Sequence, residues 1–74
     1  MTELEFVNKA IEGGYTREQR LTPAGHLKSI HEIVLDPNAW EAVFGKFGEW
    51  YMNEMIGFLY ENKRKTVADY LETL

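Results

Sequence analysis

The chain has no cysteine, no long apolar run and no excess of basic residues. Without cysteine it can form no disulfide, no thiolate zinc site and no cysteine nucleophile. A membrane-spanning helix needs about 18 consecutive apolar residues, and no stretch of the sequence approaches that length. The N-terminus is acidic, whereas a signal peptide begins with basic residues. We therefore expect a soluble, cytoplasmic protein.

Basic residues are also outnumbered, because eight Lys and Arg face twelve Asp and Glu, which gives a net charge of −4. The ranges 1–37 and 38–74 each contain six acids and four bases. Binding to nucleic acid depends on clustered Lys and Arg, so a nucleic-acid partner is not expected. The one basic run, Lys63 to Lys65, is interpreted as a solvated connection between helices.

At 74 residues the chain forms one domain, 1–74, that buries only about 60 to 65% of its unfolded surface. The core must then be dense, and 45% of the residues are hydrophobic and 14% aromatic. Large rings bury roughly 150 to 250 Å² each. The rings expected to supply this core are Phe6, Trp40, Phe44, Phe47, Trp50, Phe58 and Tyr70.

The first helix is predicted over residues 3–12. Thr2 and Glu5 have capping-box spacing, apolar residues then recur with helical period, and Gly13-Gly14 can end the helix. Residues 15–25 mix polar residues with proline and glycine and predict a loop. Thr22-Pro23 could instead begin a short helix, since proline suits the first helical position.

Residues 26–35 fit two patterns. Apolar positions favour a helical stripe, while the run Ile33-Val34-Leu35 is apolar and β-branched enough for a short buried strand. The residue before a proline is also pushed toward extended geometry, which affects Asp36. We expect a helical turn followed by an extended segment near 30–35.

Asp36-Pro37 predicts the start of the next helix, because aspartate caps and proline fixes φ where no N–H bond is lost. Its apolar face contains Trp40, Val43 and Phe44, with Phe47 as a further candidate, and it ends at Gly45 or Gly48.

A longer helix is predicted from Glu49, and Asn62 to Lys65 breaks it. Its apolar stripe has the spacing i, i+3, i+4, i+7, i+8 and consists of Met52, Met55, Ile56, Leu59 and Tyr60. Thr66 and Asp69 resemble a capping box for a last helix. The predicted fold is a mainly α single-domain bundle of three to four helices.

The GKFG sequence, Gly45 to Gly48, lies between two of these helices. It lacks the spacing and the Ser or Thr of a phosphate-binding loop. It is closer to the GXXG loop of KH domains, which clamps a nucleic-acid backbone, although the residues after Lys63 look helical where that fold has a strand. The alternative we favour is that both glycines shape a helix-to-helix turn.

His26, His31 and Glu32 are the only hint of a metal site or an acid–base pair. Five residues correspond to about 140° of helical rotation, so the imidazoles would not share a face as in H-E-x-x-H. We expect His26 to be exposed and His31 partly packed. Ser29, the sole serine, lacks a nucleophile elbow. We predict no catalytic residue, no metal and no cofactor, and no small-molecule substrate is evident.

Trp50, Tyr51 and Met52 are consecutive, about 100° apart around a helix, so the three side chains cannot all face one core. An exposed Trp or Tyr is a typical interface anchor. We therefore predict self-association or binding of a protein partner through the helix from Glu49 to Tyr60. The candidate interaction residues are Trp50, Tyr51, Glu54 and Tyr60.

Three stretches, FVNKAIEGGY, IVLDPNAWEAVFGKFGEW and VADYLETL, resemble a family of short, functionally uncharacterised proteins found in phage, prophage and metagenomic sequences. They cover about half the chain. An aromatic residue is common in that family where Ala39 stands here, and the segment between the first two motifs is short. The resemblance implies a mobile-element origin, and thus a host-cell cytoplasm, and no activity.

The function expected from these observations is that of a small non-enzymatic phage or prophage protein that binds another macromolecule. One alternative is an inhibitor of a host defence or nucleic-acid-processing protein that uses an acidic surface, although an even charge distribution makes a weak field. The other alternative is KH-like RNA binding through Gly45 to Gly48.

Overall fold

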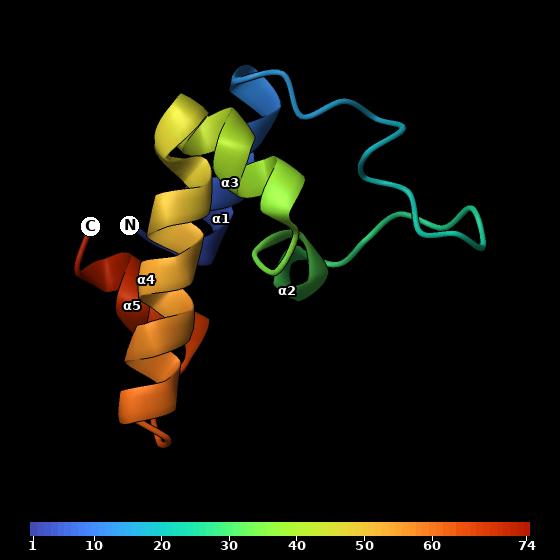
Figure 1. Ribbon diagram of the computed structural model, residues 1–74. Coiled ribbons are helices and arrows are strands. Elements are labelled where there is room, and N and C mark those ends of the chain that lie inside the picture. Colours follow the sequence, from blue (N-terminus) through green and yellow to red (C-terminus); the bar gives the residue numbers. More distant parts are fainter.

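A computed structural model describes all 74 residues and contains helices joined by turns, with no strand. In chain order the helices are α1 (Glu3–Glu12), α2 (Ile30–Ile33), α3 (Pro37–Phe44), the 3₁₀ turn η1 (Gly45–Phe47), α4 (Gly48–Glu61) and α5 (Val67–Glu72). Figure 1 shows α4 as the longest rod, with α3 and α5 against it, and α1 behind them packed against α3. The predicted mainly α architecture is confirmed. No helix is both long and apolar enough to span a bilayer.

The predicted helix starts are also confirmed. Thr2 and Glu5 form a reciprocal capping box on α1, and Thr66 and Asp69 form another on α5. The Asp36 carboxylate accepts the Asn38 N–H at 3.0 Å and so caps α3. These side chains satisfy backbone N–H groups that have no partner inside the helix.

The extended segment predicted near 30–35 is wrong, because this stretch is a helical turn. Ser29 and Glu32 form a capping box on α2, and Val34 continues the turn with φ −70° and ψ −7°. The turn buries the side chains of Ile33 and Val34 together, which an alternating strand could not do. Thr22-Pro23 starts no helix; the Thr22 carbonyl accepts the Gly25 N–H at 2.9 Å in a tight turn.

Trp40 lies at the centre of the core. Its side chain is 0% exposed, its ring centroid is 4.8 Å from that of Phe6 and 6.2 Å from that of Tyr70, and its indole N–H donates to the Val34 carbonyl at 2.9 Å. The other buried apolar side chains are Val7, Ala10, Tyr15, Ile33, Ala39, Met55, Val67 and Leu71. All five α-helices thus contribute to one core.

The loop between α1 and α2 extends away from the helices, as Figure 1 shows in blue to green. Its only ladder-type pairing is an isolated antiparallel bridge between Leu21 and Leu27. The two chain ends lie side by side (Figure 1), where the Met1 ammonium donates to the Leu71 carbonyl at 2.6 Å.

Candidate functional site

Glycines determine the corner between α3 and α4. Gly45 ends α3 with φ +60°, a conformation that disfavours any other residue. A Cβ on Gly48 would lie 2.6 Å from the backbone of Glu41, so only glycine lets α4 begin this close to α3. The GKFG sequence is therefore the helix-to-helix turn that we favoured. The chain has no sheet, so the KH-like alternative lacks the strand that it needs after α4.

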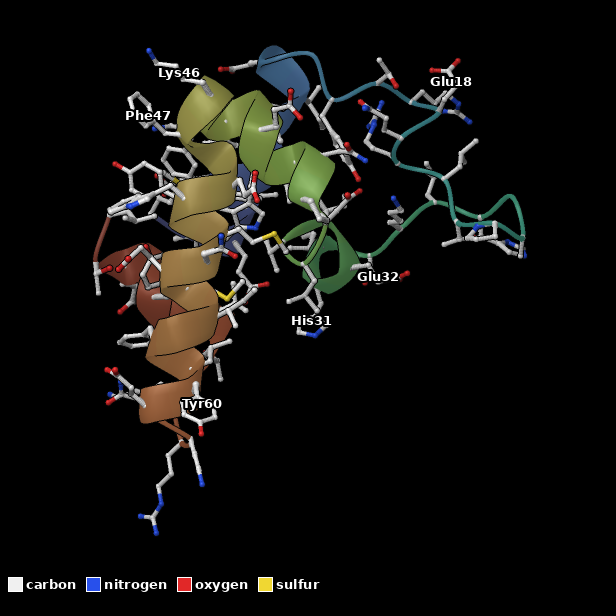
Figure 2. All side chains as sticks on the ribbon, viewed as in Figure 1. Glu18, His31, Glu32, Lys46, Phe47 and Tyr60 are labelled. Carbon is white, nitrogen blue, oxygen red and sulfur yellow. The ribbon has the colours of Figure 1, made fainter.

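This corner directs aromatic rings outward. Phe47 is 55% exposed and Trp50 is 57% exposed, although composition placed both rings in the core. Together with Tyr51 they line an open, mainly apolar hollow of about 310 Å³. We call Phe47, Trp50 and Tyr51 the aromatic corner. Figure 2 shows Phe47 and Lys46 at the same end of α4, far from Tyr60.

The rings of the corner are ordered by one another. Tyr51 stacks on Phe44 with ring centroids 4.2 Å apart, and Trp50 meets the edge of Tyr51 at 4.9 Å. The Lys46 ammonium lies 5.3 Å from the centre of the Phe47 ring, within the range of a cation–π contact. Tyr51 is thus half inside the core and holds Trp50 at the surface.

The inner face of α4 differs from the predicted stripe. Met55 is buried and Met52 and Leu59 are partly buried, as expected, but Ile56 and Tyr60 are exposed. The helix is rotated toward Tyr51 and Phe58. The reason is aromatic stacking, since Tyr51 packs on Phe44 and Phe58 packs on Tyr70 at 5.6 Å.

The rotation leaves a continuous exposed surface along α4. We call it the outer face of α4, and its residues are Trp50, Asn53, Glu54, Gly57, Tyr60 and Glu61. Tyr60 is 80% exposed. Three of the four residues predicted to interact, Trp50, Glu54 and Tyr60, therefore share this surface, and the fourth, Tyr51, supports it from below. Phe47 was not among the predicted interaction residues.

A second cluster, which sequence reasoning missed, is polar and lies where the loop meets α3. The Lys28 ammonium donates to the Asp36 carboxylate at 2.8 Å and to the Gln19 carbonyl at 2.6 Å. The Tyr15 hydroxyl hydrogen-bonds to the same carboxylate. We call Tyr15, Lys28 and Asp36 the polar anchor.

The charges of the polar anchor are matched. Burial of Asp36 opposes its ionisation, but hydrogen bonds from Lys28, Tyr15 and the Asn38 N–H outweigh burial and hold the Asp36 pKa below its ordinary value. The hydrogen bond to Asp36 raises the Lys28 pKa. Burial and the neighbouring Asp36 carboxylate raise the Tyr15 pKa. The cluster is a fully partnered tie between the loop and α3.

The largest hollow of the surface, about 410 Å³, lies between the end of α1 and the α3–α4 corner. Glu41 and Lys46 are the only ionisable residues in its lining, and three glycines lie there too. A Cβ on Gly13 would lie 2.0 Å from the Ala42 carbonyl oxygen, so the helices meet closely at its floor. The hollow exists because the glycines have no side chains to fill the space beside this close helix contact.

The histidines lie apart from these surfaces. His26 is exposed in the loop, and His31, predicted to be partly packed, is exposed on α2 (Figure 2) because the buried side of this single turn is occupied by Ile33 and Val34. No group of three or more His, Asp or Glu residues is placed to hold a metal ion. Ser29 acts as the helix cap of α2. No protein-family model, curated protein or solved structure matches the chain.

Proposed function

We propose that this chain is a small non-enzymatic protein of phage or prophage origin that acts in the host cytoplasm by binding a protein through the outer face of α4 and the aromatic corner. The observation that supports the proposal is the exposure of Trp50 and Phe47 above an apolar hollow. Large rings that are held rigidly at a surface are the residues that most often dominate binding energy.

The surroundings of the rings fit a protein surface better than a nucleic acid. Glu49, Glu54 and Glu61 are the only charged residues of α4, and Lys46 is the one base beside the rings, so acids outnumber bases around the surface and disfavour phosphates. The apolar aromatic corner continues into the polar residues Asn53, Glu54 and Glu61 of the outer face, and protein interfaces commonly combine aromatic and polar residues. The resemblance to short phage and prophage proteins supports the origin.

Affinity capture from the native host with tagged protein, followed by mass spectrometry, tests this proposal. We expect Trp50→Ala and Phe47→Ala to lose the captured protein. Leu4→Ala is a matched control, because Leu4 is 56% exposed on α1, away from the proposed surface. Capture that is unchanged by both aromatic substitutions would overturn the proposed surface.

A further inference from the structure

Gly57 stands in the middle of the outer face of α4, where the isolated chain has no use for a glycine. A Cβ at this position would meet nothing within 4 Å, and Gly57 is not among the glycines with positive φ. Glycine in a helix interior destabilises the helix relative to alanine. Nothing inside the monomer offsets this cost, whereas close approach of another backbone is a use that glycine serves and larger residues do not.

A hollow of about 340 Å³ opens beside this glycine, and its lining includes Glu54, Phe58 and Tyr70. Tyr60, the most exposed large apolar side chain of the chain, lies one turn beyond Gly57 on the same helix. The surface thus combines the hollow, the protruding ring of Tyr60 and Gly57, which has no side chain.

The charges along this surface change sign at one end. Glu49, Glu54 and Glu61 are the charged residues of α4, which has no basic residue. After the C-cap Asn62, the exposed turn Lys63, Arg64 and Lys65 carries three positive charges. An acidic helix followed by a basic turn makes the surface complementary to a reversed copy of itself.

We infer that the occupant of the outer face of α4 is a second copy of this chain, with the two α4 helices antiparallel and crossing at Gly57. In that arrangement, residues of α4 equally far from Gly57 on either side lie opposite each other. The helix ends at Glu61, and the exposed turn Lys63 to Lys65 that follows it lies beside the first turn of the second copy's α4, near Trp50 and Glu49. The inference rests on the proposed function, since it names the partner of the same surface.

Each opposed pair is chemically matched. A guanidinium stacks on an indole ring, and a lysine ammonium pairs with a carboxylate. Glu54 lies opposite Tyr60, whose ring enters the hollow beside Gly57 and whose hydroxyl can donate to the Glu54 carboxylate. Because both halves of the interface repeat the same contacts, the association closes as a two-fold dimer and does not propagate.

The size of the contact determines the concentration at which to look for the dimer. A helix of 14 residues is about 21 Å long at 1.5 Å per residue, so the interface is at the small end of specific interfaces. We therefore expect a weak dimer that forms at roughly 10 to 100 micromolar and dissociates on dilution.

Charge reversal with complementary rescue tests the arrangement by sedimentation equilibrium. The acid-reversed variant is Glu49→Lys with Glu54→Lys, and the base-reversed variant is Arg64→Glu with Lys65→Glu. Each variant alone places like charges opposite each other, so each is expected to be monomeric where the natural chain is dimeric. An equimolar mixture restores opposite charges at both ends, and the dimer mass should return.

Matched controls carry the same change in net charge on other surfaces. Glu12→Lys with Glu18→Lys, and Lys9→Glu with Arg17→Glu, use exposed residues of α1 and the loop and should remain dimeric. Circular dichroism of every variant confirms that it is folded. A natural chain that stays monomeric at 100 micromolar, on the order expected for so small an interface, or a mixture that fails to restore the dimer, overturns the inference.

The failure of this inference can be separated from failure of the proposed function. A monomeric chain from which Trp50→Ala removes a captured host protein overturns the second copy as partner and leaves the binding surface in place. A monomeric chain whose capture Trp50→Ala leaves unchanged overturns both.

Discussion

The two tryptophans stand ten positions apart on opposite sides of the Gly45 to Gly48 corner, in opposite environments. Trp40 is wholly buried and hydrogen-bonded to a backbone carbonyl, and Trp50 is more than half exposed. The same side chain thus fills the core in one place and creates an apolar surface in the other. The difference assigns core stability to Trp40 and leaves Trp50 free for the binding that we propose, so substitution of each ring should affect one property and not the other.

Trp40→Ala tests this separation with the largest expected effect. Removing a fully buried aromatic side chain costs about 3 to 5 kcal/mol, which is comparable with the whole stability of a domain this small, about 3 to 5 kcal/mol. We expect loss of the cooperative thermal transition in circular dichroism. Trp50→Ala, an exposed substitution, should change the free energy of unfolding by no more than about 0.5 kcal/mol. Equal destabilisation by the two substitutions would contradict the contrast.

The polar anchor comes next in size, because it fixes the loop to the start of α3. Asp36→Ala removes a helix cap and the partner of Lys28 together, and should lower the free energy of unfolding by about 2 to 3 kcal/mol. Asp36→Asn keeps a capping side chain and loses only the charge, so its cost should be smaller, about 1 to 2 kcal/mol. Urea unfolding measures both. Identical losses would mean that the ion pair accounts for the whole effect and that the helix cap contributes nothing measurable.

The pH dependence of stability should follow the same cluster. The Asp36 pKa is lower in the folded protein than in the unfolded chain, so its contribution is complete above the unfolded pKa of about 3.9. That contribution is lost as the pH falls through the folded pKa. Capping hydrogen bonds lower the pKa values of Glu5, Glu32 and Asp69 in the same direction. Unfolding free energy should therefore decline below about pH 4.

The decline of the unfolding free energy at acid pH should be shallower in Asp36→Asn, since one of the responsible carboxylates is gone.

At alkaline pH, burial raises the pKa values of Tyr15 and Tyr70. A raised folded pKa gives stability that is complete below the unfolded value of about 10 and is lost above it. Urea titrations from pH 2.5 to 11 measure both limits. A variant with the same acid slope as the natural chain would remove Asp36 from this account.

Local patterns predicted the ends of the helices well, because capping acts within three or four residues. Thr2 with Glu5, Asp36-Pro37, and Thr66 with Asp69 all begin helices as expected. Ser29 and Glu32 have the same spacing and begin α2, so the capping pattern also indicates a helical turn in the segment near 30–35.

Contacts between residues far apart in the sequence could not be predicted from local patterns. Tyr15 and Asp36 are 21 positions apart, and nothing near either residue indicates the other. The rotation of α4 likewise depends on rings from α3 and α5, so apolar spacing alone placed Ile56 inside. The surplus of rings around Trp50 could be predicted, because three consecutive large side chains exceed one helix face, but which ring is exposed depends on the Phe44 stack.

A substitution at Gly57 has a small expected effect on stability and is the most informative for binding. Gly57→Ala adds a methyl group that meets nothing in the monomer, and alanine is the better helix former, by up to about 1 kcal/mol. We therefore expect the free energy of unfolding of the diluted Gly57→Ala monomer to be higher than that of the natural monomer.

Sedimentation equilibrium of Gly57→Ala against the natural chain tests the central claim most directly. If two α4 helices meet at Gly57, the added methyl group separates them, and the dissociation constant should rise at least about tenfold, a change of about 1.4 kcal/mol, while the monomer becomes more stable. A variant that associates as tightly as the natural chain would contradict the account.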